Sequence, residues 1–527
     1  MQRFLNPMLQ HFGNPSLRPT VAKAARRIMA ALEAGQTIAV FGDYDVDGMT
    51  STALVVSALR LLGGNVVWRL PHRLNGGYGL NLERASELAD LGASLVITVD
   101  CGISAVDEVS YLAGRGIDVI VTDHHQLHGD MPNALAVINP QIWDADDEFR
   151  DLAGVGVAFL LICAVSVEAR TRPSLAGQQI DPKSFLDLVA MGTVADMVPL
   201  RGHNRLLVVK GLEVLAKDAS RAGLAALKER AKCNGPILDA GSIAWNIAPR
   251  LNAAGRLGDA SIGVELLLAS ERHKALELTN AVEELNSKRR LLEQAILDSA
   301  VNQVLDAGEE PTGPLVLASP DWHLGVVGIV AARVAERFRL PAILLVQDGN
   351  MVTGSARSIA GFDIAAALAM HPELFLRFGG HSQAAGLTMD VGNVDALREY
   401  LKVAYTDHIG RVGSEPELTI DVLLQLSALS ADHVKVMERL APFGTGNPEP
   451  VLASTAVRVV DKRIIKNDSL KLTFEQAGRR VEGLWWRAPE LGVRVGDVVD
   501  VAYVPEMRSF QGLTTLGIKI KDMRPAA

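Results

Sequence analysis

The sequence predicts an α/β protein of several domains that ends in a small β-barrel. Three observations support this prediction. Apolar runs typical of buried strands alternate with segments of helical spacing before residue 140, and the same alternation returns after residue 314. An almost continuous helix-forming stretch, residues 260–305, separates the two regions. Short alternating strands replace this pattern after residue 450.

The composition is that of a folded protein from a reducing compartment. The chain has 527 residues, 48% of them hydrophobic and 21% charged, which allows roughly two to four packed domains. Its net charge of −9 argues against a general nucleic-acid coat protein. It does not argue against a nucleic-acid enzyme, because metal-binding acids lower the total and basic grooves can be local. The three cysteines are too far apart for a disulfide framework or a CxxC zinc site. Without an apolar run of about 18 residues or a signal-peptide pattern, we expect a soluble, cytoplasmic protein.

The first region is expected to form a mostly parallel sheet covered by helices on both faces. The predicted strands are Thr37–Val40, Asn65–Leu70, Ser94–Val99, Asp118–Thr122 and Leu135–Ile138. The predicted helices are residues 21–34, Met49–Leu62, Leu82–Leu91 and Val106–Ala113. Sheets of this kind bind ligands at the carboxyl ends of their strands.

The stretch Phe41–Thr50 (FGDYDVDGMT) places Asp43, Asp45 and Asp47 directly after the first strand. Carboxylates this close repel one another, so they indicate either a solvated turn or a site for a compensating cation. A calcium loop of the EF-hand type is excluded. Its twelfth position needs a bidentate Glu, where this chain has Leu54, and a helix rather than a strand would precede it.

Further acids and imidazoles lie at the ends of later elements. They are Asp100, Asp123, His124, His125 and Asp196. Any one of them alone is more often a helix cap or a turn, but together they indicate a metal site. Oxygen and imidazole ligands without thiolate favour Mn²⁺ or Mg²⁺ over structural zinc. Because five or six ligands exceed the needs of one ion, we expect two ions about 3.5–4 Å apart, bridged by a carboxylate.

Four motifs, in this order, resemble those of the DHH phosphoesterase superfamily. They are DYDVDG at 43–48, VDCG at 99–102, TDHH at 122–125 and GTVADMVPL at 192–200. The later segments WHLGVVGIVAARV at 322–334 and FGGHSQAAGL at 378–387 are similar to those of the bacterial single-strand-specific 5′→3′ exonucleases in that superfamily. The resemblance covers nearly the whole chain.

The resemblance implies a role for each residue of the site. The implied metal ligands are Asp45, Asp47, Asp100, His124 and Asp196, with Asp43 and Asp123 in or near the ligand set. Asp100 would bridge the two ions, and His125 would face the scissile phosphate, so that His125, Asp100 and Asp123 form the implied catalytic set. Several members of the superfamily carry a His where this chain has Phe41, so one metal is expected to have fewer protein ligands here.

The segment 245–260 (WNIAPRLNAAGRLGDA) is a candidate for contact with a phosphate backbone. Arg250, Asn252 and Arg256 lie among small residues and have room to project. Guanidinium groups suit bidentate phosphate contacts, although surface salt bridges are the alternative. The sequence from 260 to 305 is helix-forming almost throughout, and its residues 278–305 have the apolar spacing of a long amphipathic helix that is expected to span two domains.

Beyond a linker at residues 308–314, a second, smaller α/β domain is expected. Its candidate substrate contacts are His323, Ser355, Arg357, Ser358, Gly379, Gly380 and His381. The two glycines permit close approach of the backbone, although a Gly-Gly-His sequence alone is more often a turn. The resemblance implies that this domain holds nucleic acid opposite the metals, with the two serines available to donate hydrogen bonds to a terminal 5′ phosphate.

Five short strands after residue 450 suggest a barrel of the OB type. From residue 451 onward there are 13 Lys plus Arg against 9 Asp plus Glu. Trp485, Trp486, Tyr503 and Phe510 are candidates for stacking on bases, with at least one of the tryptophans facing the core. The expected domains are a DHH domain at 1–260, a connecting helix at 261–308, a DHH-associated domain at 309–412 and an OB-like single-strand-binding domain at 413–527.

These features predict a metal-dependent nuclease that removes 5′ mononucleotides from single-stranded DNA, a reaction of DNA repair and recombination. The 5′ polarity rests on the resemblance, as do the expected partners, a single-strand-binding protein and a helicase, and the expected monomer. The first alternative is a phosphoesterase for very short oligonucleotides or nucleotides, which would not need the C-terminal barrel. The second is a non-catalytic replication scaffold, which the complete set of ligands disfavours.

Overall fold

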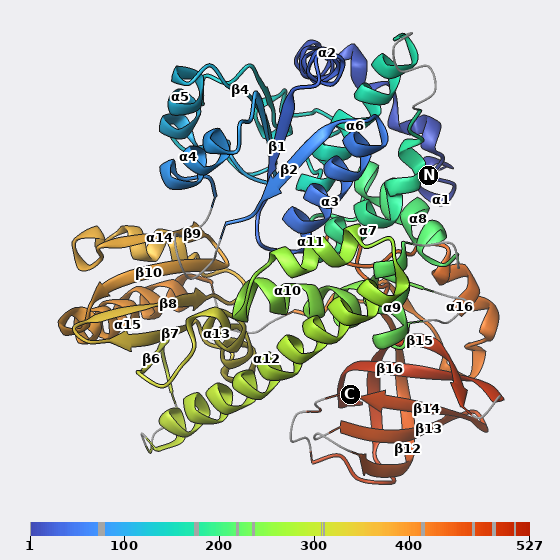
Figure 1. The fold of residues 1–527 in the computed structure, drawn as a ribbon. Helices are drawn as coiled ribbons and strands as arrows, with labels where there is room; N and C mark the ends of the chain where they lie inside the picture. The colour runs from blue at the N-terminus through green and yellow to red at the C-terminus, as the bar shows by residue number, and fades with distance from the viewer. Residues whose placement is uncertain are drawn as a thin grey trace.

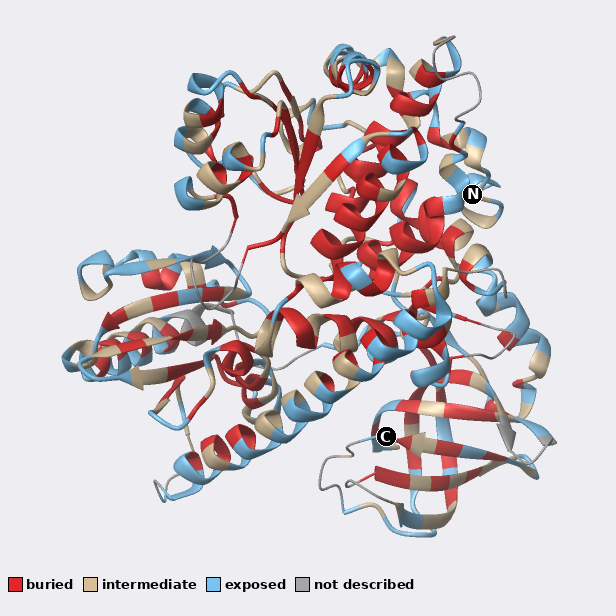
Figure 2. Ribbon diagram, viewed as in Figure 1, coloured by how far each residue is buried: buried red, intermediate tan, exposed pale blue. Residues whose placement is uncertain are grey.

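The computed structural model has three folded parts, and one long helix connects the first two (Figure 1). Figure 2 shows that buried residues concentrate in the N-terminal sheet and the helices around it, while the long helix is exposed along most of its outer side. None of the helices in the described part of the chain combines the length and apolarity needed to cross a bilayer. The structure describes residues 2–71, 79–172, 179–217, 221–233, 238–306, 308, 311–412, 417–465, 469–486, 488, 492–510 and 513–526.

The N-terminal part contains a five-stranded sheet that is parallel throughout, with strand order β2-β1-β3-β4-β5. The strands are β1 (Thr37–Phe41), β2 (Asn65–Arg69), β3 (Leu95–Val99), β4 (Asp118–Thr122) and β5 (Ala136–Ile138). Their alternate side chains enter two apolar layers, because successive residues of a strand face opposite sides of the sheet. The predicted parallel sheet, covered on both faces, is confirmed.

Helices cover the two faces unequally. The helices α2 (Pro19–Glu33), α3 (Val46–Leu61) and α6 (Gly154–Arg170) pack on the face that carries Ile38 and Val40. On the other face, Ala39 and Phe41 pack with α4 (Leu82–Asp90) and α5 (Val106–Gly114). The thicker face is extended by α7 (Leu186–Ala195), α8 (Gly202–Leu215), α9 (Ala222–Arg230) and α11 (Ser261–Leu268), and the short α1 (Gln2–Leu5) begins the chain.

The connecting helix α12 runs from Arg272 to Asp306 and is 35 residues long, which corresponds to roughly 50 Å. Leu278 and Val282 near its start belong to the apolar core of the first part. Ile296 and Val301 near its end belong to the core of the second part. The helix therefore spans both parts, as the sequence predicts, but it begins later than the predicted residue 261, because Ser261–Leu268 form the separate helix α11.

The second part is a mixed sheet with strand order β6-β7-β8-β10-β9. Its strands are β6 (Leu315–Ser319), β7 (Ala342–Asp348), β8 (Met351–Arg357), β9 (Arg377–His381) and β10 (Ala384–Asp390). Its helices are α13 (Leu324–Phe338), α14 (Ile364–Ala369) and α15 (Val394–Val412). The strand β9 is not predicted from the sequence, because Gly379 and Gly380 interrupt any apolar pattern; it forms as an edge strand paired with β10.

The C-terminal part is a closed barrel of five strands. They are β12 (Leu452–Ile465), β13 (Ser469–Gln476), β14 (Arg479–Trp485), β15 (Val498–Phe510) and β16 (Leu513–Pro525). The barrel closes because β12 pairs with both β13 and β15. A short strand β11 (Val422–Leu423) and a helix α16 (Ala431–Glu438) precede it. The predicted boundary between 412 and 413 borders residues 413–416, which lie outside the described residues, as do 309 and 310 in the predicted linker.

Candidate active site

The acids singled out in the sequence meet at one edge of the parallel sheet. The strand β1 leads into the loop of Asp43 and Asp45, β3 leads into Asp100, and β4 leads into His124. Because the three strands are adjacent and parallel, their carboxyl ends lie side by side. Asp196 joins them from the end of α7. Three groups have potential ligand atoms within 4.8 Å of one another: Asp100, His124 and His125; Asp47, His124 and Asp196; and Asp43, Asp45 and Asp100.

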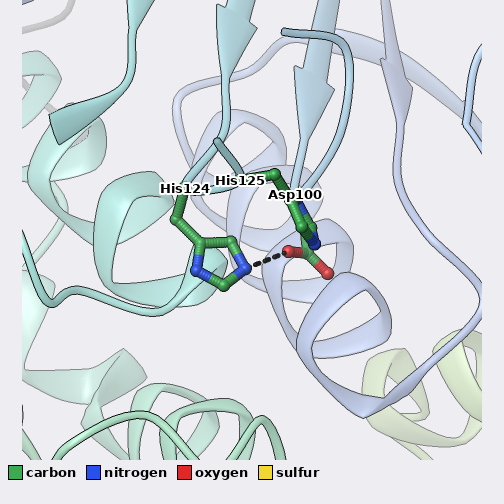
Figure 3. A group of neighbouring side chains, drawn as sticks. All are labelled: Asp100, His124 and His125. Carbon is green, nitrogen blue, oxygen red and sulfur yellow. Dashed lines mark ion pairs between the residues drawn. The ribbon is translucent and has the colours of Figure 1, made fainter. Parts of the chain in front are cut away.

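His124 lies at the centre of this cluster and points toward Asp100 (Figure 3). Its Nε2 atom is 3.1 Å from Oδ1 of Asp100, 3.7 Å from Oδ2 of Asp196 and 3.9 Å from Oδ2 of Asp47. Burial, together with repulsion from His125, lowers the pKa of His124 to about 3. The imidazole is therefore neutral at physiological pH, and it cannot balance the charge of three carboxylates.

The pKa values of the carboxylates are shifted upward. Burial, followed by repulsion from Asp45, raises the pKa of Asp47 to about 7. Burial, followed by repulsion from Asp47 and Asp45, raises the pKa of Asp196 to about 9. The same causes raise the pKa of Asp100 well above its usual range. Crowded buried carboxylates of this kind ionise readily only when a cation lies among them. The oxygen and imidazole donors fit Mn²⁺ or Mg²⁺.

Backbone amides fix the orientation of two of these carboxylates. Oδ2 and Oδ1 of Asp47 accept hydrogen bonds from the amides of Gly154 (2.7 Å) and Val155 (2.8 Å), at the first turn of α6. Oδ1 of Asp45 accepts from the amide of Gly48 (3.1 Å) and caps α3. Each carboxylate is thereby held by the start of a helix, before any ion binds.

Two glycines that sequence reasoning missed make room for the cluster. A Cβ atom at Gly154 would lie 2.4 Å from Oδ1 of Asp100. A Cβ atom at Gly192 would lie 2.7 Å from Oδ1 of Asp47 and 2.4 Å from Oγ1 of Thr50. Gly192 stands inside the fourth motif, so it was visible in the sequence, but only the packing of α7 against α3 shows why no side chain fits there.

Asp100 adopts a left-handed backbone conformation, with φ of 61°, and so does Met197, directly after Asp196. Non-glycine residues in this region are uncommon and store strain of about 1–3 kcal/mol, which the surrounding structure must offset. Two of the clustered acids are therefore at or beside strained positions.

His125, which belongs to one of the three groups, forms an ion pair with Asp123. Nδ1 of His125 is 2.8 Å from Oδ1 of Asp123. Although burial opposes it, the hydrogen bond and the charge of Asp123 raise the pKa of His125 to about 9. The ring is positively charged at neutral pH and 42% exposed, so it can meet an anion. The amides of His124 and Ile103 also donate to Asp123 (2.7 and 2.9 Å), so this carboxylate holds the loop and lies in none of the three ligand groups.

Asn139 is a further residue that sequence reasoning missed. It is fully buried, and its Nδ2 donates to the carbonyl oxygen of His125 (2.8 Å). Phe41, at the position where a ligand was expected to be missing, is also fully buried. Its side chain lies in the apolar layer with Ala85 and Leu88, on the face away from α3. Phe41 therefore supplies packing only.

The helix α10 (Ala248–Leu257) contacts both the loop of Asp43 and Asp45, called the metal loop below, and the second part of the chain. A Cβ atom at Gly255 would lie 2.3 Å from the carbonyl oxygen of Tyr44, between Asp43 and Asp45. The next residue, Arg256, meets α13: its Nη1 donates to the carbonyl oxygen of Gly325 (3.4 Å), and its own carbonyl would lie 2.2 Å from a Cβ atom at Gly325. Gly255 thus lies against the loop of Asp43 and Asp45, and Arg256 contacts the start of α13.

Four of the predicted substrate contacts share one face of the second sheet. Arg357 and His381 both pair with Ala384, in register across three strands, and Ser355 and Gly379 both pair with Gly386. Residues directly opposite in antiparallel strands project to the same side, so Arg357 and His381 lie on one face roughly 10 Å apart. Gly379, His381 and Gly386 are exposed, whereas Ser355 and Arg357 are partly buried.

The start of α13 lies against the same residues. A Cβ atom at Gly328 would lie 3.1 Å from Nη2 of Arg357 and 3.2 Å from Oγ of Ser355. His323 caps the helix by accepting the amide of Gly325 at Nδ1 (3.1 Å). Arg256, His323, Ser355 and Arg357 therefore gather near a helix N-terminus, where backbone amides favour anions.

The structure places other predicted contacts differently. The Nε atom of Arg250 is 2.6 Å from Oε2 of Glu283, so this guanidinium forms an internal ion pair. Asn252 is half-buried on α10. The hydroxyl of Ser358 donates to the carbonyl oxygen of Phe362 (2.5 Å) and is not directed at the sheet face. A Cβ atom at Gly380 would lie 2.2 Å from the carbonyl oxygen of Ala384, so this glycine is required by the strand pairing.

The aromatic residues of the barrel divide into core and surface. Trp485 is buried, and Tyr503 is fully buried with its hydroxyl 2.9 Å from Oγ of Ser454. The expectation that Tyr503 stacks on bases is therefore wrong, because β15 turns it into the core. Trp486 is 58% exposed and remains available. The side chain of Phe510 lies outside the described part of the chain.

The parallel sheet, with acids and a His pair at its carboxyl edge, defines a protein of the DHH class. Sequence models of three families match the chain: the N-terminal domain of the DHH family at residues 37–193, the DHHA1 domain at 312–406 and the RecJ OB domain at 420–522.

Individual similar proteins identify the family within this class. The single-stranded-DNA-specific exonuclease RecJ of Salmonella typhimurium is 35% identical over 96% of this chain and 90% of its own length. The protein of the same name from Escherichia coli is 35% identical over the same shares. The crystal structure of RecJ from Thermus thermophilus with Mn²⁺ superimposes with a TM-score of 0.86 at 32% identity, covering 100% of this chain and 74% of that one. This chain belongs to the RecJ family.

Proposed function

We propose that this chain is a metal-dependent exonuclease that hydrolyses single-stranded DNA from its 5′ end and releases 5′ mononucleotides, in DNA repair and recombination. One observation carries the proposal: Asp47, Asp100, His124 and Asp196 gather in one buried cluster, in a chain that resembles named single-stranded-DNA-specific exonucleases over nearly its full length. The 5′ polarity rests on the family resemblance.

In this proposal the clustered side chains hold two divalent cations, Mn²⁺ or Mg²⁺. The ligands are Asp45, Asp47, Asp100, His124 and Asp196, with Asp43 beside them. The structures of RecJ with Mn²⁺ and with Mg²⁺ from Thermus thermophilus support this choice of metals. When bound, such cations supply positive charge for the phosphate and activate the attacking water.

The remaining residues position the strand. His125 is charged because Asp123 stabilises its protonated form, so it can donate a hydrogen bond to a phosphate oxygen beside the metals. Asp123 acts through His125 and the loop, rather than by contact with the substrate. In the proposal, Arg256, His323, Ser355 and Arg357 hold a neighbouring or terminal phosphate, which their position near the start of α13 supports.

The C-terminal barrel favours this function over that of an enzyme for dinucleotides, which would not need it. A closed OB-type barrel with the exposed Trp486 is suited to a longer strand. A single-strand-binding protein and a helicase as partners, a monomeric state and a cytoplasmic location are also part of the proposal, and they rest on the resemblance alone.

A gel assay tests the proposed function. Single and duplex strands, labelled at either end and with or without a 5′ phosphate, are incubated with the protein in Mn²⁺ and in Mg²⁺. The proposal predicts that a 5′ label is released at once as mononucleotide from the single strand, while a 3′ label stays on fragments that shorten gradually. Release of a 3′ label first, or equal degradation of the duplex, would overturn it. Preference for a dinucleotide over the long strand would favour the alternative.

A further inference from the structure

Trp245 is an exposed aromatic residue that the proposed active site does not use. It lies on a π-helix, Ser242–Ile247, which runs directly into α10. Its side chain is 79% exposed, although a tryptophan on a surface loses the benefit of burial. Single turns of π-helix are rare and occur frequently at functional sites. Exposure and the π-helical turn together make this position a candidate for contact with a ligand that has an apolar face.

Trp245 belongs to the same helical segment as two candidate DNA contacts. Ile243, Ile247 and Leu251 are buried on the inner side of this continuous helical segment. Trp245 is exposed, and Asn252 and Arg256 are partly exposed. The positions 249, 252 and 256 form one stripe of α10. Trp245 lies about one turn before Pro249, in the π-helical segment, and is exposed.

The other end of this stripe lies at the metal loop. Gly255 abuts the carbonyl oxygen of Tyr44, and Arg256 contacts Gly325 of α13. At 1.5 Å per residue, Trp245 lies roughly 15 Å along the helix from that point. A strand that ran from the metals along this stripe would pass Trp245 after a few nucleotides.

Two arginines lie near the segment that carries the tryptophan. Arg250, five residues on, donates from Nη1 to the carbonyl oxygen of Asn246 and pairs with Glu283 through Nε (2.6 Å). Nε of Arg230, at the end of α9, is 3.8 Å from the same carboxylate oxygen, and this side chain is 53% exposed. The carboxylate of Glu283 is shared by both guanidinium groups, and Asp239, whose Oδ1 accepts hydrogen bonds from Ser242, is a second acid beside this segment. Of the two guanidinium groups, that of Arg230 is the more exposed and can meet a phosphate.

We infer that Trp245 is a stacking platform for a base of the single strand, a few nucleotides away from the metal centre. Sites that bind single strands without sequence preference typically combine aromatic side chains with basic residues. The inference rests on the proposed function for the identity of the ligand. It adds a contact within the N-terminal part, separate from the barrel.

The test measures binding without hydrolysis. A fluorescein-labelled oligo(dT) of about 20 nucleotides, longer than a typical single-strand site, is titrated with the full chain in EDTA, and the dissociation constant is read from anisotropy. We expect Trp245→Ala to raise this constant about tenfold or more, and Trp245→Phe to restore most of the affinity, because a benzene ring keeps the stacking face. Leu291→Ala is the matched control: Leu291 is 74% exposed on α12, outside the stripe, and its truncation should leave the constant unchanged.

An affinity of Trp245→Ala within twofold of the wild type would overturn the inference, and would leave this surface for a protein partner instead. Failure of Trp245→Phe to restore binding would also overturn it, since the effect would then not be stacking. Thermal melting checks that the variants are folded. Failure of the proposed function is a distinct result: the wild type would then leave single strands intact in Mn²⁺, whatever the anisotropy in EDTA shows.

Discussion

Nε2 of His124 lies 3.1 Å from Oδ1 of Asp100, although the two residues follow different strands, β4 and β3, of the parallel sheet. The contact brings a neutral imidazole against a buried carboxylate whose pKa is raised by burial. The two groups do not form an ion pair, because the imidazole is neutral. This relationship is the reason to treat the cluster as a metal centre, and the first prediction follows from it.

His124→Ala should weaken Mn²⁺ binding at least tenfold, because it removes a ligand that faces three carboxylates. Isothermal titration calorimetry gives the affinity. The control is His128→Ala, since His128 lies four residues further along the same loop and is exposed. Equal affinities for His124→Ala and the wild type would show that the imidazole is not a ligand.

The raised pKa values of Asp47 and Asp196, about 7 and about 9, predict a pH dependence. In the metal-free protein these acids stabilise the fold while they are protonated. That contribution is complete below their unfolded pKa near 3.8 and is lost as the pH rises through about 7 and about 9. The melting temperature in EDTA should therefore fall between pH 6 and pH 9.

Metal binding should show the opposite trend. Because the ligands must lose their protons, the affinity for Mn²⁺ should rise over the same pH interval and binding should release protons. Asp196→Asn removes one titrating group and should flatten the fall in melting temperature. A melting temperature in EDTA that stays constant from pH 6 to pH 9 in the wild type would contradict the assignment.

Gly192→Ala should damage the metal centre through its added methyl group. The new Cβ atom would meet Oδ1 of Asp47 and Oγ1 of Thr50, so Asp47 must shift. We expect a loss of stability of about 1–3 kcal/mol and a weaker affinity for Mn²⁺. Gly211→Ala is a matched control, because its Cβ atom would crowd the carbonyl oxygen of Leu186 at 2.2 Å, away from the acids. It should lower stability while the folded protein keeps its metal affinity.

The loop after Asp196 contacts the segment at Thr445 and Gly446, which leads into the barrel, and we call this contact the clamp. The amide of Leu200 donates to the carbonyl oxygen of Thr445 (2.7 Å), and a Cβ atom at Gly446 would lie 2.9 Å from Cβ of Pro199. Gly446→Val should push this loop away and weaken Mn²⁺ binding by several-fold through Asp196.

The control for this substitution is Gly478→Val. Gly478 has a φ of 76°, close to the 71° of Gly446, but nothing lies within 4 Å of its Cβ position. Its substitution strains the backbone alone. If both variants changed metal affinity equally, or neither did, the clamp would have no role in placing Asp196.

The sequence predicts the metal centre well because its signal is topological. Acids placed after parallel strands must converge at one edge, so Asp100 and His124 can be assigned to one site from strand order alone. The same logic fails for Asp123, which also follows β4. Its carboxylate turns back to backbone amides and His125, a choice of rotamer that no spacing encodes.

Packing details also lie beyond the sequence pattern. Tyr503 sits on a strand with alternating residues, and only the closure of the barrel shows that its hydroxyl bonds Ser454 in the core. Gly154 looks like any small residue in an apolar helix, because the atom it must avoid belongs to Asp100, in a distant segment. Trp245 gives no signal of exposure, since the π-helix that presents it has no sequence signature.

The most direct test of the account combines metal binding and hydrolysis in one variant, Asp100→Asn. Asparagine tolerates the left-handed backbone at this position and nearly preserves the volume, so the fold should persist. Mn²⁺ binding is measured by calorimetry, and hydrolysis is measured on a 5′-labelled single strand. The account predicts two bound ions in the wild type, fewer or much weaker ions in the variant, and a loss of hydrolysis of at least about a hundredfold. Wild-type binding and a wild-type rate in Asp100→Asn would contradict it.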